Sequence, residues 1–230
     1  MLAEPYGDSA LLVTAAGGGA DDRWRTVQHL ADLVEAQAPP GVLDVVATYD
    51  TLLVEFDCAV TGHADVEAAI ARWHGVPPPR AGTTRLFTVP TCYGGGFGPD
   101  LARVAARLGV TEDEVVRLHT GVDWVVRFRG APVGAPMMDG APYTTSISRL
   151  AHPRPRVPAG SVALSGRQAV IYPVPSAGGW NLIGRTPARL VDLGERPHVA
   201  YRPGDRIRFV AVRWSDWAAH EGAALRARRG

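Results

Sequence analysis

Two arginines, Arg154 and Arg156, lie one residue apart in the proline-rich segment 153–158. Side chains two residues apart on an extended chain point to a similar side. Two guanidinium groups on one side suit a carboxylate or a phosphate, because each group can donate two parallel hydrogen bonds. The other reading is a pair of surface ion pairs, and these residues alone leave both open.

A second polar segment, 177–187, combines a glycine turn with an aromatic ring, an amide, an arginine and a hydroxyl group. Glycines allow a backbone to approach a ligand closely. The alternative is that the tryptophan packs in the core and the arginine lies on the surface without binding a ligand. The number of glycine, aromatic and polar residues within this short segment favours a binding site. The candidate residues here are Trp180, Asn181, Arg185 and Thr186.

His119 follows an expected helix and precedes an expected strand. Histidine is the usual proton-transfer group near neutral pH, so His119 is the candidate catalytic residue. A packed histidine, or one whose charge complements a helix C-terminus, is the commoner outcome at such a position.

A glycine cluster, 94–98, comes directly before Pro99 and Asp100, which can open a helix. Backbone amides at a helix N-terminus bind anions. The chain contains no lysine and has no phosphate-loop spacing, so we interpret the cluster as a tight turn. None of the seven histidines pairs with a cysteine or another histidine at ligand spacing, so no metal site is expected.

The bulk properties are those of a globular protein. The chain has 230 residues, of which 46% are hydrophobic, and a net charge of +1. That balance gives no reason to expect a nucleic acid or an anionic membrane as partner. We find no apolar run long enough for a membrane helix, no secretory signal and only two distant cysteines, so we expect a cytoplasmic protein with reduced thiols.

The elements that must position these residues fall into two groups. Apolar periodicity over the first 90 residues predicts the order β-α-β-β-α-β, which is typical of a ferredoxin-like domain. The strands are expected at 10–14, 42–49, 51–56 and 85–89, and the helices at about 21–37 and from Thr61 onward.

The second group has two short helices followed by short strands between Gly and Pro residues. Thr111 and Glu114 have the spacing of a capping box. Strands with intervening turns suggest a small barrel; they are expected at 124–128, 161–165, 169–172, 181–185 and 206–212. The Pro- and Gly-rich segment 130–158 is expected to be a functional or mobile loop, and 215–229 an amphipathic helix.

An ordered series of motifs along nearly the whole chain carries a family resemblance. The chain resembles the first subunit of allophanate hydrolase, also called the 5-oxoprolinase B subunit, in a family that includes the kinase inhibitor KipI. The matching motifs are Tyr6–Leu11, Tyr93–Gly95, Gly98–Leu101, Glu114–Val116 with His119, 153–162, Gly166, Gln168, Ile171–Pro173, 178–180, 184–187, and 203–205 with Phe209.

The resemblance implies an α+β fold: a small ferredoxin-like α/β domain at 1–84 and a cyclophilin-like β-barrel domain at 85–230. It implies a subunit of an ATP-dependent amide or lactam hydrolase that is inactive without a larger second subunit. The alternative is a KipI-like inhibitor of a sensor histidine kinase. A neighbouring or fused gene for the larger subunit would favour the enzyme.

The resemblance also suggests roles for individual residues. Anion binding is expected of Arg154, Arg156 and Arg185, and proton transfer of His119. Gln168 and Asn181 would orient polar groups of a substrate. Tyr172, Trp180 and Thr186 complete the expected substrate site.

One segment departs from the family pattern. Positions that are usually aromatic hold Ala131, Ala135 and Met137, and a Pro-Arg pair is replaced by Ser148 and Arg149. We expect the residues from 130 to 149 to form a mobile loop beside the binding face, since long loops and methionine surfaces adapt to varied partners.

Overall fold

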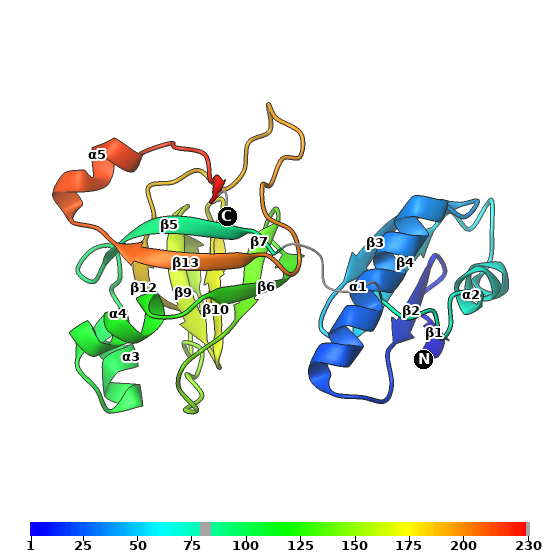
Figure 1. The fold of residues 1–230 in the computed structure, drawn as a ribbon, viewed down its shortest axis with the longest axis horizontal. Helices are drawn as coiled ribbons and strands as arrows, with labels where there is room; N and C mark the ends of the chain where they lie inside the picture. Colours follow the sequence, from blue (N-terminus) through cyan, green and yellow to red (C-terminus); the bar gives the residue numbers. More distant parts are fainter. Residues whose placement is uncertain (79–83, 229–230) are drawn as a thin grey trace. The chain divides into compact units, whose positions relative to one another are not determined.

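The computed structural model describes residues 1–78 and 84–228. The chain divides into two compact units, Met1–Gly82 and Thr83–Gly230 (Figure 1). In the described ranges, no helix combines the length and apolar character that crossing a membrane requires.

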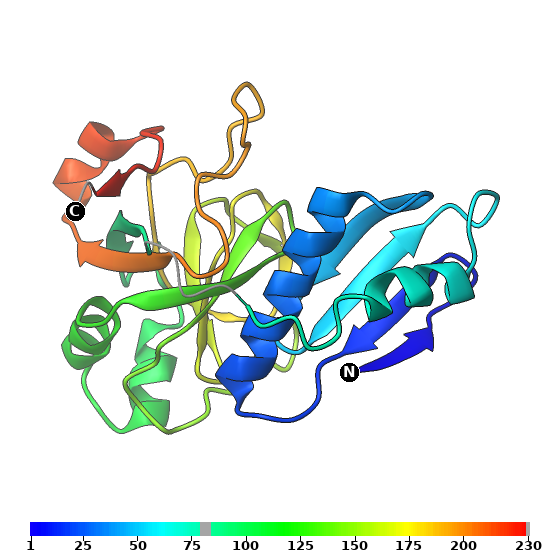
Figure 2. The ribbon, with the colours of Figure 1, turned by 45° about the vertical axis from the view of Figure 1, so that its right-hand side comes forward.

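The first unit is a four-stranded antiparallel sheet with two helices. Its strand order is β1-β2-β4-β3, and helix α1 lies along one face of the sheet (Figure 2). Buried residues of α1, including Val27 and Val34, pack with Leu11, Leu52 and Phe56 of the strands. The elements are β1 (Leu2–Pro5), β2 (Ala10–Thr14), α1 (Ala20–Gln37), β3 (Val42–Ala47), β4 (Thr51–Phe56) and α2 (His63–Ala71).

The expected split β-α-β arrangement is present, because β4 lies between β2 and β3 and is antiparallel to both. The strand on the other side of β2 is the N-terminal strand β1. The expectation that residues 85–89 complete this sheet is wrong. Those residues belong to β5 (Leu86–Tyr93), which pairs in parallel with β13 (Arg206–Ala211) in the second unit.

The second unit is a mixed β-barrel, so the expected α+β fold with a C-terminal barrel is confirmed. Its strand order is β12-β9-β10-β7-β6-β13-β5-β14, and β12 also pairs with β5. The remaining elements are α3 (Leu101–Leu108), α4 (Glu112–Thr120), β6 (Trp124–Gly130), β7 (Ala135–Asp139), β8 (Arg154–Val157), β9 (Ser161–Ser165), β10 (Gln168–Ile171), β11 (Ser176–Gly178), β12 (Asn181–Arg185), η1 (Trp214–Asp216), α5 (Trp217–His220) and β14 (Ala227–Arg228).

The pairing of β12 with β5 closes the barrel, and an ion pair strengthens the junction of β5 with β13. Gly184 of β12 pairs with Tyr93 of β5, and a Cβ at Gly184 would lie 2.7 Å from the carbonyl oxygen of Cys92, so glycine allows this close approach. At the other end of β5, Arg85 donates through Nε to the buried Asp205 at 3.1 Å. That ion pair ties the start of β5 to the start of β13.

A two-stranded ribbon, β8 with β11, covers part of the barrel's outer face. All five residues of β9 are buried. Val162 and Leu164 belong to the main core, whereas Ala163 packs in a second cluster with Val157 of β8 and Tyr172. The two clusters alternate along β9, so the strand is covered on both faces.

The expectation of a mobile loop from 130 to 149 is wrong for its central part. Residues Ala135–Asp139 form strand β7 between β6 and β10, and Ala135 and Met138 are fully buried. The departures from the family pattern at Ala135 and Met137 therefore fall on a barrel strand.

The helix expected at 215–229 is confirmed only in its first part, where η1 (Trp214–Asp216) and α5 (Trp217–His220) follow one another. It is wrong for Ala227–Arg228, which form β14, and Arg229 lies outside the described residues.

His119, at the end of α4, is 1% exposed. Its Nδ1 lies 2.8 Å from the Tyr93 hydroxyl, its carbonyl accepts from Trp124 Nε1 at 3.0 Å, and its ring centre is 4.2 Å from that of Phe209. Burial lowers the pKa of His119 to about 3, so the ring is neutral at physiological pH. These are the contacts of a packed core histidine.

The burial of Ala135 predicts the effect of restoring the family's aromatic residue there. Ala135→Phe adds a ring to a filled cluster and should lower the free energy of unfolding by about 1–3 kcal/mol. Ala131→Phe is the matched control, because Ala131 is exposed and should tolerate the ring. Chemical denaturation of both variants measures this, and equal stabilities would show that Ala135 is not tightly packed.

The neutral state of His119 predicts a pH dependence of stability. The unfolded chain takes up a proton near pH 6.5, whereas the folded chain resists it down to about pH 3. The contribution is therefore fully present above pH 6.5 and falls with decreasing pH, by up to about 1.4 kcal/mol per pH unit. Denaturation between pH 7 and 5 should show a shallower slope for His119→Gln and an unchanged slope for His152→Gln, a change at an exposed histidine. Identical slopes in the wild type, His119→Gln and His152→Gln would contradict the conclusion that the fold keeps His119 neutral.

Candidate functional site

A buried carboxylate, Asp100, organises the polar residues on one side of the barrel. Its Oδ2 accepts from Leu182 N at 2.8 Å, and its own N–H donates to Leu182 O at 2.9 Å. Its Oδ1 accepts from Arg154 Nη2 at 2.8 Å. Asp100 directly precedes α3, so one side chain joins this helix, strand β12 and the ribbon strand β8.

Arg154 retains donor capacity after pairing with Asp100. Its Nη1 is buried and has no hydrogen-bond partner among the residues that the structure describes. Leaving a charged donor buried without a partner is unfavourable, and a ligand oxygen would remove that penalty. Arg156 is exposed on the same strand, so the two arginines have different environments although they lie only two residues apart.

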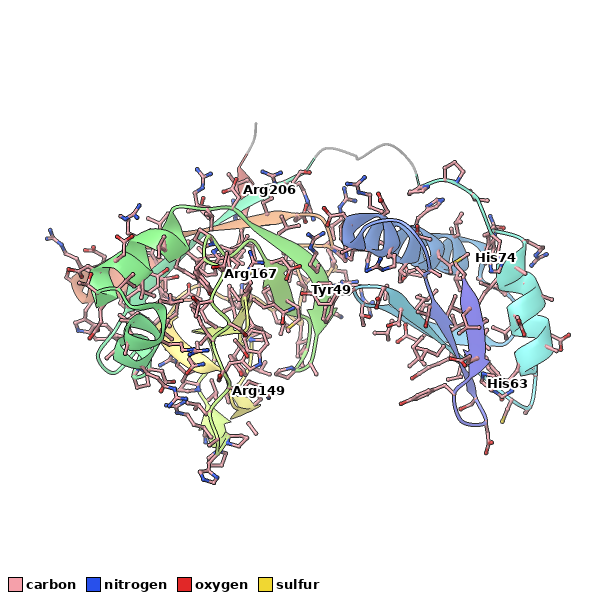
Figure 3. All side chains as sticks on the ribbon, turned by 90° about the horizontal axis from the view of Figure 1, so that it is seen from below. Tyr49, His63, His74, Arg149, Arg167 and Arg206 are labelled. Atoms are coloured by element: carbon pink, nitrogen blue, oxygen red, sulfur yellow. The ribbon has the colours of Figure 1, made fainter. Side chains whose placement is uncertain are left out.

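Tyr172 lies close to Arg154 and to Arg149. Burial raises the pKa of its hydroxyl. Three smaller effects oppose that rise: the charge of Arg149, a hydrogen bond with the Trp180 backbone and the charge of Arg154. A Cβ at Gly178 would collide with the Tyr172 hydroxyl, so glycine lets the ribbon pass over the ring. Arg149, labelled in Figure 3, is exposed.

The start of β12 completes the cluster. Asn181 is fully buried, and its Nδ2 donates to Ser148 O at 2.9 Å and to Leu164 O at 3.1 Å. Leu150 N donates to Gly179 O at 2.8 Å. These bonds hold the segment around Arg149 against the barrel. We call Asp100, Arg149, Arg154 and Tyr172, with Trp180 and Asn181, the polar cluster.

Other expected site residues lie outside the polar cluster. Gln168 starts β10, opposite Ser165 and Asp139 in the strand register. Arg185 donates to Ala159 O at 2.8 Å and lies over the Trp217 ring, with 5.5 Å between its Cζ and the ring centre.

Thr186, which is buried, accepts from Ala188 N at 3.2 Å. His119 lies in the core described above. Substrate contact by any of these residues, and proton transfer by His119, stay predictions.

The glycine cluster before α3 does not fit a phosphate. The amides of Gly94 and Asp100 donate to Ile183 O and Leu182 O, and the amide of Gly98 donates to Gly94 O. A Cβ at Gly98 would collide with Ile183 O, so this glycine is needed for the close approach of the turn to β12. In the part of the chain that the structure describes, no three His, Cys, Asp or Glu side chains are placed to hold a metal ion.

Sequence reasoning missed two members of the polar cluster. The sequence indicated only that Asp100 starts a helix and that Arg149 belongs to a segment that departs from the family pattern. Together with Arg154 and the Tyr172 hydroxyl, Arg149 makes this side of the barrel suitable for an anion or for an oxygen that becomes negative during a reaction.

Comparisons with known proteins agree with this architecture. The family model of the carboxyltransferase domain, subdomains C and D, matches residues 1–201. The 5-oxoprolinase B subunit of Bacillus subtilis (strain 168) is 32% identical over 233 residues, which cover 95% of both proteins.

Two solved structures also match. The crystal structure of TTHA0988 superimposes with a TM-score of 0.77 at 32% identity, covering 90% of this chain and 40% of that one. The Kluyveromyces lactis urea amidolyase superimposes with a TM-score of 0.80 over 98% of this chain and 16% of its own, at 14% identity, which shows a shared fold. This chain thus spans well under half the length of either structural relative.

The match to the family model covers the first unit and most of the second, up to residue 201, and the bacterial relative matches along its length. Both findings agree with the barrel that the structure shows. The chain belongs to the carboxyltransferase subdomain C and D family, together with the 5-oxoprolinase B subunits.

Proposed function

We propose that this chain is the smaller subunit of an ATP-dependent amide or lactam hydrolase of the 5-oxoprolinase type. The observation that carries the proposal is the 32% identity with a 5-oxoprolinase B subunit over 95% of both chains. A relative named as one subunit of 5-oxoprolinase implies an enzyme of several subunits, and we propose that a larger second subunit completes this one.

The polar cluster supports this reaction class. Opening an amide places negative charge on the former carbonyl oxygen, and charged donors fixed in advance stabilise such charge. Arg154 offers a buried Nη1 without a partner in the described ranges, and Arg149 adds a second guanidinium nearby. Because burial raises the pKa of Tyr172, its hydroxyl keeps its proton and can donate as well.

In the glycine cluster, the amides of Gly94 and Gly98 already have partners within the fold, which supports a tight turn in place of a phosphate site. We therefore propose that ATP binds in the complex with groups from the larger subunit. When bound, ATP would activate the amide oxygen or a carboxylate by phosphorylation. The arginines of the polar cluster would then hold the charged oxygen in position.

An aromatic surface supports the need for a protein partner. Phe97 has ring centres 5.0 Å from Trp214 and 5.1 Å from Trp217, and Trp214 is 63% exposed. Arg185 lies over Trp217. Tryptophan and arginine are enriched among residues that dominate binding energy at interfaces. We propose that this aromatic surface contacts the larger subunit.

Arg154 provides the first test. Arg154→Lys removes the planar, two-pronged donor and should lower kcat/KM with 5-oxoproline about tenfold or more in the complex, because hydrogen bonds to charged groups contribute about 1.5–3 kcal/mol. Lysine keeps the positive charge beside Asp100, so the melting temperature should change little. Arg202→Lys is the matched control, since Arg202 is an exposed arginine outside the polar cluster, and should keep full activity. Arg156, which is exposed on the same strand as Arg154, stays a predicted anion-binding residue. Equal activity of both variants would reject the anion-binding role of Arg154.

Assembly provides the second test. Co-expression with the product of the neighbouring gene should give one complex in size-exclusion chromatography, with an interface above about 1,000 Å². Trp214→Ala should weaken the complex, whereas Leu193→Ala, at a residue that is 75% exposed, should not. Separate elution of the two wild-type chains at micromolar concentration would count against the proposal.

A further inference from the structure

The outer face of helix α2, in the first unit, is a surface that the proposed function does not use (Figure 1). The inner face of α2 buries Val66 and Ile70 in the core of that unit. A surface hollow of about 470 Å³ lies between α2 and the turn that follows α1. Because residues three, four and seven positions apart lie on one side of a helix, the hollow runs along α2. Its lining includes Asp65, Ala68, Ala69 and Arg72 from the α2 side and Pro39 with Pro40 from the turn.

This outer face has opposite charges at its two ends. Asp65 and Arg72 are both exposed and are separated by about two helical turns, or roughly 10 Å along the axis. Within residues 1–78 and 84–228, no ion pair involves either side chain. Arg72 donates through Nε to Ala69 O at 3.2 Å, and its Cζ lies 5.9 Å from the centre of the Trp73 ring. These contacts hold the positive end in place without neutralising its charge.

The middle of the outer face is made of small side chains. Ala68, which is exposed, and Ala69, which is half-buried, lie between the two charges. Alanine at a helix crossing lets the axis of a second helix come to about 8 Å, the short end of the usual range. The occupant that fits is therefore a helix whose charges run in the opposite order.

A second copy of α2 in the antiparallel direction meets this requirement. A twofold axis between Ala68 and Ala69 lies midway in the sequence between Asp65 and Arg72. Such an axis places Asp65 of each copy opposite Arg72 of the other, because a twofold interface contains every contact twice. A parallel arrangement would bring like charges together, which is unfavourable. The charge order of α2 is thus complementary to itself only in the antiparallel direction.

Exposed apolar side chains on both sides of α2 agree with the same arrangement. Val60, which is 63% exposed, comes shortly before α2, and Val76, which is 42% exposed, follows it. In an antiparallel pair, Val60 of one copy approaches Val76 of the other. Apolar surface is then removed from water at both ends of the contact, which favours association.

We propose that α2 is a self-association surface and that two copies of this chain pair through it as an antiparallel dimer. α2 has nine residues, and a helix of that length is only about 14 Å long. A contact of this size falls short of the roughly 1,000 Å² of a stable specific interface, so we expect a weak dimer with a dissociation constant on the order of 100 μM. This dimer does not depend on the proposed function, because neither the polar cluster nor the aromatic surface contributes to it.

Sedimentation velocity of the full chain alone measures this dimer. The concentration should run from about 5 to about 500 μM at low salt, where exposed charges are screened least. We expect the weight-average mass of the wild type to rise with concentration towards twice that of the monomer. The rise should be smaller at high salt, because exposed ion pairs are weakened by screening.

Charge substitutions locate the interface. Asp65→Arg or Arg72→Asp replaces two attractive pairs with two repulsive ones and should raise the dissociation constant about tenfold or more. Glu67→Arg is the matched control for Asp65→Arg. It makes the same change of charge at an exposed residue of α2 that does not line the hollow, so it should change the dissociation constant much less.

Two restored pairings distinguish a lost interface from a damaged fold. The double variant Asp65→Arg with Arg72→Asp reverses the charge order and should dimerise like the wild type. An equal mixture of the Asp65→Arg chain and the Arg72→Asp chain should form a heterodimer although each chain alone stays monomeric, since each supplies the charges that the other lacks. Thermal melting of every variant checks that it is folded.

Four results would overturn the proposed dimer. A wild type that stays monomeric at the highest concentration would leave the hollow to a different occupant. A dimer that Asp65→Arg does not weaken would place the contact elsewhere on the chain. Equal weakening by Glu67→Arg would indicate general charge repulsion, and a double variant that is folded but monomeric would show that the two charges do not pair across the interface.

Discussion

The ion pair between Asp100 and Arg154 is the interaction on which the functional side of this protein depends. Asp100 is 7% exposed and binds both the Leu182 backbone and Arg154. The Asp100 side chain is nearly buried, whereas that of Arg154 is partly exposed. Removing the arginine would therefore leave the carboxylate without compensation in a medium of low dielectric constant, which is destabilising. The contacts of Asp100 thus hold the start of α3 against β12 and β8.

Double coverage of the barrel strands gives this arrangement its rigidity. Inner residues of β9, β10 and β12 pack in the main core, and outer residues such as Ala163, Val170 and Leu182 pack beneath the β8–β11 ribbon. The ribbon carries Arg154 on one strand and Gly178 on the other. A charged side chain can be held in a fixed geometry here because the apolar layer below it is closely packed.

The polar cluster combines charged donors with an amide that holds the backbone around them. Arg154, Arg149 and Tyr172 are the donors that we propose contact an oxygen that gains charge. Asn181, at the start of β12, donates to Ser148 O and so holds the residue next to Arg149 against the barrel. Donors held in place before a reaction do not have to be ordered during it.

The sequence by itself determined the elements that local patterns specify. Strands 161–165 and 181–185 have the expected bounds, α1 ends at Gln37 before two prolines, and Thr111 caps α4 by accepting from Glu114 N. These features depend on apolar periodicity and capping within a few residues. The alternation of short strands and turns also predicted the small barrel, and the resemblance added the family, which the comparisons confirm.

Only the tertiary structure decided how residues far apart in the sequence combine. Asp100 and Arg154 are 54 positions apart, and nothing in either local segment specifies their pairing. The same holds for β1 beside β2 and for β7 in a segment rich in Pro and Gly, because neighbouring strands supply their hydrogen bonds. The neutral state of His119 likewise arises from burial by Phe209 and Trp124, which only the folded barrel brings to its ring.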